Sequence, residues 1–270
     1  MTLSELLRAA RRQPGSLVSQ VTDDWLQGRS AFGGLQGAFA VEAMRTLVDP
    51  SFPLRTFQMT FVAPIGVGEC VTRASVLRAG KNTMHVEARI VNGEETLAHA
   101  VGVFGHARES IVKRDLPMAP ARKTGTPLPY VPNVMPSFFQ HFDVALLDGA
   151  LPYSGRPVHR NVFELGLKDS STTTDAHLIA LADFVPPVAL SWMPKPVPGS
   201  SMTWMLEFLD QDFAQQPLGG WLVDSEMVAA RDGYTSQSTT LWSPAGLPGS
   251  VWNWSRKSSR TTWRATSTGP

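Results

Sequence analysis

The sequence holds a single cysteine, Cys70, in 270 residues, so an internal disulfide is excluded, and without a CxxC pair nothing supports a zinc site. No apolar stretch approaches the ~20 residues that a membrane-spanning helix needs. Residues 1–13 combine leucines and arginines as a short amphipathic helix does, and they lack the apolar core of a signal peptide. We therefore expect a cytoplasmic protein with no metal and no membrane insertion.

The charge is nearly balanced. The chain has 24 basic and 23 acidic residues and a formal net charge of +1. No global field therefore draws it to nucleic acid or to an anionic membrane, and we expect no nucleic-acid partner. An anionic ligand would have to meet local positive groups, and Arg55, Arg73, Arg78 and Lys81 are candidates that the sequence does not rank.

Two common catalytic motifs are also missing. There is no Gly-x-Ser-x-Gly turn between a strand and a helix, which disfavours a serine hydrolase. There is no GxxxxGK[ST] loop, which disfavours nucleotide-phosphate chemistry. The chemistry of the chain must come from another arrangement.

The residues that are present have the composition of an ordinary globular protein, with 43% hydrophobic and 17% charged residues. An apolar stripe with helical spacing predicts a buried helix over 34–47. Four stretches rich in β-formers follow at 54–62, 68–77, 83–91 and 96–105, and Asn92-Gly93 between the last two is a strong hairpin signal. This order predicts an α+β half.

The same order returns after a proline-rich stretch. A predicted helix over 175–190 precedes predicted strands at 200–209, 219–230, 233–242 and 249–255, and Thr56–Val62 can be laid over Thr203–Leu209 at an offset of 147 residues. We interpret this as a duplication. The predicted organisation is an N-terminal domain over 1–114, a linker over 115–136, a C-terminal domain over 137–254 and a mobile or irregular tail over 255–270.

Particular residues carry a family resemblance. In the first half they are Gly28-Arg29-Ser30-Ala31-Phe32-Gly33-Gly34 before the helix, then Leu54–Phe57 and Phe61–Pro64; in the second half they are Leu181-Ala182-Asp183, Glu207–Leu209 and Thr240–Gly246. Over roughly 25–254 the sequence resembles acyl-CoA thioesterase II-like (TesB-like) double-hotdog proteins.

The resemblance implies an α+β fold in which two hotdog domains share one continuous antiparallel sheet wrapped around two central helices. It implies hydrolysis of an acyl-CoA to free acid and CoA without a cofactor, and association into a homo-oligomer. In that family an Asp on the second helix, a Thr or Ser on the next strand and a Gln on the last strand orient the attacking water.

Carried onto this chain, the Asp falls on Asp183, which lies among apolar residues suited to a partly buried proton acceptor. The alternative is an Asp that only ends the helix before Pro186-Pro187. The hydroxyl falls on Thr203 by spacing, or on Ser201 by alignment of the strand end. The two residues are two positions apart, which predicts a shared strand face.

The Gln is where the chain departs from the family, because counting from Gly246 places Trp254 or Asn253 there, or Lys257 after a three-residue insertion. In the first half His99 takes the corresponding position. This departure leaves open a non-catalytic acyl-CoA-binding protein.

The remaining candidates surround the start of the first helix. Gly33 and Gly34 would offer backbone N–H groups to a thioester oxygen, and Gln36 and Gln58 would add amide groups for substrate binding. A hotdog hydratase would need an Asp/His pair near the start of a helix, and neither half shows one there.

Overall fold

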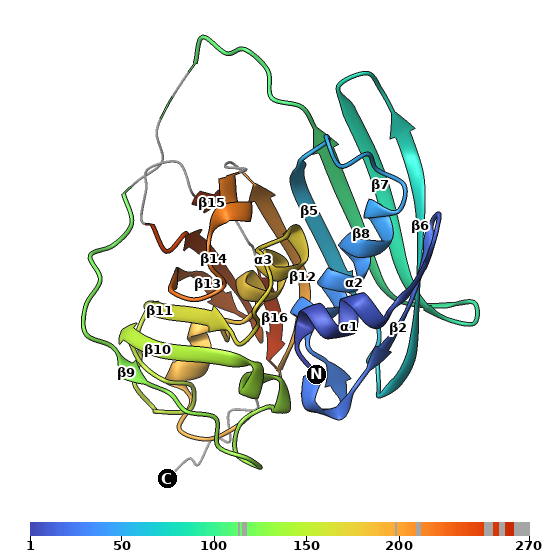
Figure 1. The fold of residues 1–270 in the computed structure, drawn as a ribbon. Helices are drawn as coiled ribbons and strands as arrows, with labels where there is room; N and C mark the ends of the chain where they lie inside the picture. Colours follow the sequence, from blue (N-terminus) through green and yellow to red (C-terminus); the bar gives the residue numbers. More distant parts are fainter. Residues whose placement is uncertain are drawn as a thin grey trace.

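The structure is a computed structural model that describes residues 1–112, 114, 118–197, 199–208, 212–245, 251–253 and 257–261. The chain forms two halves, each with one central helix wrapped by strands (Figure 1). The described residues between 106 and 125 run along the outside of the molecule before the second half begins (Figure 1). This is the double-hotdog arrangement predicted from the sequence.

The first half begins with a short helix and a hairpin, and its central helix then precedes four strands. Its elements are α1 (Leu3–Ala9), β1 (Arg11–Gln13), β2 (Ser16–Val21), η1 (Asp23–Trp25), β3 (Leu26–Gln27), β4 (Ser30–Ala31), α2 (Gly33–Arg45), β5 (Leu54–Phe61), β6 (Gly68–Ala79), β7 (Thr83–Asn92) and β8 (Glu95–Gly105).

The second half repeats the order of strands, helix and further strands. Its elements are β9 (Thr126–Pro127), η2 (Ser137–His141), β10 (Phe142–Asp148), β11 (Arg160–Leu167), α3 (Asp175–Asp183), η3 (Val188–Trp192), β12 (Gly199–Phe208), η4 (Asp212–Gln215), β13 (Trp221–Arg231), β14 (Tyr234–Trp242), β15 (Val251–Asn253) and β16 (Lys257–Thr261).

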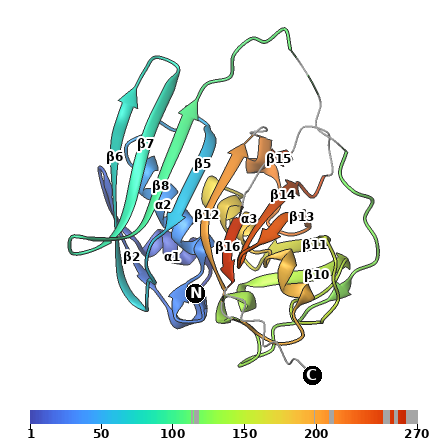
Figure 2. The ribbon, with the colours of Figure 1, turned by 180° about the vertical axis from the view of Figure 1, so that it is seen from behind.

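The two halves share one antiparallel sheet. Its order runs β1-β2-β6-β7-β8-β5-β12-β15-β14-β13-β11-β10-β9, and β16 also pairs with both β12 and β14. The halves join where β5 pairs with β12, with Thr60 opposite Thr203. Figure 2 shows this junction from behind, with β16 beside β12. The junction places both helices on the same inner face of the sheet.

The inner face is identified by burial and by contact with the helices. Along β5, Phe57 and Met59 are buried whereas Gln58 between them is exposed. A side chain added at Gly102 of β8 would lie 2.7 Å from Met44 Sδ of α2, so that side of the strand faces the helix. The opposite face of the sheet is the outer face.

Glycines let the two helices approach closely. A Cβ on Gly37 of α2 would lie 2.6 Å from Ile179 Cγ2 of α3, and a Cβ on Gly34 would lie 2.8 Å from the Ala180 Cα. Such distances leave no room for a methyl group. The helices run antiparallel, so the start of α2 lies against the end of α3.

At the other end of the pair, Arg45 in the last turn of α2 forms an ion pair with Asp175 in the first turn of α3. The Arg45 guanidinium also donates to the Phe52 carbonyl at 2.8 Å and lies 4.7 Å from the centre of the Phe104 ring. Burial raises the pKa of Asp175, against the opposing effect of Arg45. An ion pair therefore joins the two helices at this end.

Three predictions of secondary structure need correction. The second helix ends at Asp183 instead of Leu190, because Pro186 and Pro187 lack N–H donors, and a separate 3-10 turn, η3, follows. Residues 257–261, predicted as tail, form β16. The predicted linker contributes β9, which pairs with β10. Strands β2, β10 and β11 were not predicted.

Of the helices that the structure describes, none has the length and apolar character needed to cross a bilayer.

Candidate active site

Asp183 is the last residue of α3, and its carboxylate lies against the first turn of α2. A Cβ built on Gly33 would be only 2.5 Å from Asp183 Oδ2, so only glycine allows this approach. The side chain is nearly enclosed, since Asp183 is 5% exposed. The antiparallel helix packing therefore holds a carboxylate beside the start of the opposite helix.

The start of α2 offers hydrogen-bond donors. The first N–H that bonds within the helix is that of Gln36, which donates to the Phe32 carbonyl at 3.1 Å. The N–H groups of Gly33, Gly34 and Leu35 have no acceptor inside the helix, and the N-cap Phe32 offers no side-chain cap. The positive end of the helix dipole adds to these donors, so this turn suits an anion or a polarised carbonyl oxygen.

Aromatic rings enclose the site. A Cβ built on Gly33 would also lie 3.0 Å from the ring of Phe61, at the end of β5. The Phe61 ring and the Asp183 carboxylate therefore both lie beside Gly33. Phe32 stacks on Phe138 with 4.1 Å between ring centres, and Phe184 lies 4.6 Å from Phe142. Apolar walls lower the local dielectric and so strengthen electrostatic interactions with the carboxylate.

Gln36, one turn into α2, is buried and faces the segment that precedes the helix. Its Nε2 donates to the Ala31 carbonyl at 2.7 Å. Its Oε1 is buried and has no hydrogen-bond partner among the residues that the structure describes. An amide oxygen in this state is available to a donor from a bound ligand.

Thr203 is not brought to Asp183. Along β12 the buried residues are Trp204, Leu206 and Phe208, and Trp204 lies beside Gly37 of α2. Thr203 alternates with them and therefore points to the outer face. Its pairing with β16 shifts register between Ser201 and Thr203, so spacing alone no longer places Ser201 on the same face.

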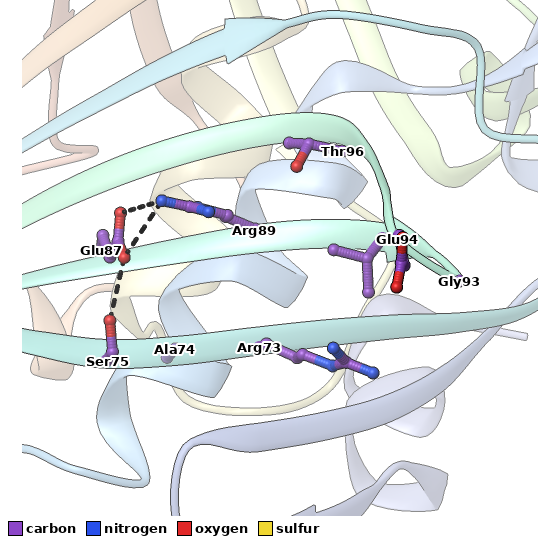
Figure 3. Close-up of a pocket in the computed structure, with 9 residues that line it drawn as sticks. Arg73, Ala74, Ser75, Glu87, Arg89, Gly93, Glu94 and Thr96 are labelled. Atoms are coloured by element: carbon purple, nitrogen blue, oxygen red, sulfur yellow. Dashed lines mark hydrogen bonds and ion pairs between the residues drawn. The ribbon is translucent and has the colours of Figure 1, made fainter.

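His99 and Gln58 also lie away from Asp183. Gln58 is exposed on the outer face. His99 Nε2 lies 3.1 Å from Glu87 Oε2 on the adjacent strand. Glu87 in turn contacts Ser75 and Arg89 beside an outer-face cavity of about 240 Å³ (Figure 3). Neither residue reaches the start of α2.

The sequence matches two family profiles that together span most of the chain. The profile of the acyl-CoA thioesterase N-terminal domain matches residues 21–105, and that of the acyl-CoA thioesterase C-terminal domain matches residues 114–251. The chain belongs to the acyl-CoA thioesterase family. No curated protein matches its sequence at a significant level.

Solved structures related to this acyl-CoA thioesterase family member share its fold at low sequence identity. A hot dog fold protein of unknown function from Alicyclobacillus acidocaldarius has a TM-score of 0.85 and 19% identity, covering 97% of this chain and 98% of its own. The acyl-CoA thioesterase II TesB2 from Mycobacterium marinum has a TM-score of 0.72 and 14% identity, covering 97% and 99%. These likenesses show the fold.

In this thioesterase family member, sequence analysis placed Asn253, Trp254 or Lys257 at the position of the glutamine of the family's last strand. Asn253 of β15 pairs with Glu207, and Lys257 of β16 pairs with Gln237. Trp254 lies outside the described residues.

Sequence analysis missed a row of buried polar residues on the inner face of β14, formed by Thr235, Gln237 and Thr239. Thr239 Oγ1 lies 2.8 Å from Ser225 Oγ of β13. Gln237 Oε1 accepts a hydrogen bond of 3.0 Å from the N–H of Val188, which follows α3. Residues 235–239 are all polar in the sequence, so no alternation marked which of them would be buried. Gln237 fixes the segment after Asp183.

Neither the cysteine nor a metal cluster in the described residues offers a competing centre. The Cys70 thiol is buried, and burial raises its pKa to about 11, so it is a poor nucleophile. Within the described part of the chain, no three His, Cys, Asp or Glu side chains gather as metal ligands would.

Proposed function

We propose that this protein hydrolyses an acyl-CoA thioester to a free acid and CoA. The observation that carries the proposal is the contact between the Asp183 carboxylate and the first turn of α2 at Gly33. Family membership supplies the substrate class. Thioester hydrolysis requires a general base and oxyanion donors, and the proposal assigns these roles to Asp183 at the end of α3 and to the first turn of α2.

In the proposed reaction, the thioester oxygen accepts hydrogen bonds from the N–H groups of Gly33 and Gly34. Asp183 takes a proton from a water molecule, whose oxygen bonds to the carbonyl carbon. The tetrahedral intermediate then collapses, the carbon–sulfur bond breaks, and the thiolate of CoA takes up the proton. No covalent enzyme intermediate is needed.

The Gln36 Oε1 oxygen is proposed to accept a hydrogen bond from an amide of the CoA arm, because it is buried and unpartnered among the described residues. Sequence analysis named Thr203 or Ser201 as the water-orienting group; Ser201 stays a prediction, and the outward direction of Thr203 argues against Thr203. We expect Thr203→Ala to leave turnover near the wild-type rate, because Thr203 points to the outer face, and a large loss would contradict that placement.

The test is release of CoA from short, medium, long and aromatic acyl-CoAs, followed with a thiol-reactive dye. Cys70 is the chain's only cysteine and is buried, so the folded protein adds little background. Asp183→Asn is compared with Asp143→Asn, which changes an aspartate whose side chain is 78% exposed. Loss of turnover in the first variant alone supports the proposal.

Binding of acyl-CoA without turnover in the wild type would instead establish the non-catalytic binding protein. We further propose that the protein acts in the cytoplasm as a homo-oligomer. Light scattering of the purified protein at several concentrations tests the assembly, and a single-chain mass throughout would contradict it.

A further inference from the structure

A second cavity lies at the tip of the β6–β7 hairpin, on the outer face of the sheet. Its volume is about 350 Å³, and its lining includes Arg78, Lys81, Asn82, Thr83, His85 and Arg108. His85 alternates with the buried Val86 and stands opposite Arg78 in the ladder, which places both side chains outward. The cavity is therefore built by two strands and by the segment after β8.

The lining is positive. It contains three permanent cations and a histidine, and no carboxylate. Elsewhere in the chain, arginines such as Arg11, Arg122 and Arg160 form ion pairs with acidic residues. Among the described residues, none of Arg78, Lys81 and Arg108 has such a partner within 4.0 Å. Like charges held together without a carboxylate favour an anionic ligand.

Local structure holds these cations in place. The register of β6 and β7 shifts between Val76 and Arg78, and a bulge of this kind re-aims the side chains that follow it. Arg108 Nη2 donates to Thr83 Oγ1 at 3.3 Å. The backbone beside it is fixed as well, since the His106 N–H donates to the Asn82 carbonyl at 3.2 Å. The basic residues thus come from ordered elements.

We propose that this cavity binds the phosphate group of a phosphorylated small molecule. Two guanidinium groups can each donate a pair of hydrogen bonds to phosphate oxygens, and the Lys81 ammonium adds a third charge that suits a dianion. The Thr83 hydroxyl and the Asn82 amide supply uncharged donors. The volume exceeds that of a phosphate alone and leaves room for the group to which the phosphate is attached.

The cavity is separate from the proposed active site. The hairpin tip adjoins the Leu54 end of β5, since Ala79 pairs with Met84, Met84 with Phe104, and Phe104 with Leu54. Asp183 lies on the inner face at the Phe61 end, about 23 Å away along a strand of eight residues. The proposal therefore stands independently of the proposed hydrolysis.

The test is titration of the purified protein with inorganic pyrophosphate by calorimetry, for the wild type and for the double variant Arg78→Gln/Arg108→Gln. We expect affinity to fall by roughly tenfold or more in the double variant, and to fall with added salt in the wild type. Arg73→Gln is the matched control, because it removes an exposed arginine from the same strand outside this cavity. It should stay within about twofold of the wild type.

Adenosine 3′,5′-bisphosphate distinguishes the source of the phosphate. Displacement of pyrophosphate by this compound identifies the ligand as a nucleotide such as that of CoA, and its failure to compete identifies a free phosphate compound. Absence of pyrophosphate binding in the wild type, or equal affinity in the double variant and the wild type, would overturn the proposal. The kcat of thioester hydrolysis by the double variant, measured in parallel at saturating acyl-CoA, should match the wild type even if KM rises, which separates this test from that of the proposed function.

Discussion

The two ends of the α2–α3 pair each hold an aspartate of α3, but the two aspartates meet different partners. Asp175 faces a guanidinium, whereas Asp183 faces a glycine at the start of a helix. The first contact is an ion pair that satisfies both groups and closes the space between the helices. The second places a buried carboxylate beside backbone N–H groups that have no acceptor inside their own helix. The group that faces each carboxylate, more than the carboxylate itself, distinguishes the Arg45–Asp175 ion pair from the candidate site.

The largest expected effect, a loss of kcat, tests this comparison by removing one of the two carboxylates at a time. Asp183→Asn should lower kcat by about 10²–10⁴, the range for loss of a general base, with little change in thermal stability. Asp175→Asn should do the reverse, lowering the melting temperature while the folded fraction keeps its activity. Turnover assays and thermal melts on both variants check this. Equal activity loss in both would show that the ends are not distinct.

Removing the Arg45 guanidinium tests the contribution of the Arg45–Asp175 ion pair to stability. Arg45→Met should destabilise the protein by about 3 kcal/mol at neutral pH, because Asp175 is left buried and unpaired. Burial raises the pKa of Asp175, so its protonated form avoids the cost. The loss should therefore shrink as the pH falls through the folded-state pKa toward the ordinary value of 3.8.

Urea unfolding at two pH values measures the Arg45 effect. The matched control is Arg12→Met, which breaks a more exposed pair with Glu42 and should cost less than about 1 kcal/mol. A pH-independent loss for Arg45→Met would show that the effect comes from packing against Phe104 instead.

Two glycines of α2 sharpen the comparison. Gly33→Ala adds a methyl group 2.5 Å from Asp183 Oδ2 and should reduce kcat about tenfold by displacing the carboxylate. Gly37→Ala adds one 2.6 Å from Ile179 Cγ2 and should destabilise the helix contact by about 1–3 kcal/mol. Kinetic assays and unfolding measurements on both variants show whether each substitution lowers kcat or stability. A purely structural outcome at Gly33 would count against the site.

The smallest effect concerns pH. His177 at the start of α3 accepts a hydrogen bond at Nδ1 from the Thr174 N–H, and its Nε2 lies 2.9 Å from Ser4 Oγ of α1. Burial lowers the pKa of His177, with Asp169 acting in the opposite direction. The unfolded chain then binds a proton near the ordinary pKa of 6.5 that the folded chain does not. Stability should therefore fall as the pH drops below that value.

The slope of unfolding free energy against pH, between pH 7 and 5, measures this effect. His177→Gln should flatten the slope, and His159→Gln, at an exposed histidine, serves as the control. An unchanged slope in His177→Gln would assign the pH dependence to other groups.

Sequence patterns predicted the fold well where one face of an element is apolar. The helix over 34–47 and the four strands of the first half correspond to α2 and β5–β8 within a few residues. Prediction failed where tertiary pairing decides structure. β11 was missed because it lies inside the sheet with apolar residues on both faces, so no alternation marks it. β16 is polar and takes its place by pairing with β12 and β14.

The candidate site, like the fold, was predicted from the sequence only in part. Gly33 and Asp183 were found through motif resemblance, and the structure brings them together. The face of Thr203 depends on alternation with Trp204, and its relation to Ser201 depends on a bulge, which spacing alone does not reveal. Sequence analysis assigned His99 by matching corresponding strands of the two halves. On β8, however, His99 faces outward and contacts Glu87. Sheet face is fixed by register, and register is a property of the whole sheet.

The β5–β12 junction has a consequence for biosynthesis. β5 is complete by residue 61, whereas its partner β12 begins at residue 199. During translation the first half therefore emerges with the backbone of β5 unpaired on that side, for the time needed to make about 140 further residues. An open strand edge is a template for pairing with other chains. The nascent protein thus needs dilution or chaperone cover until its second half arrives.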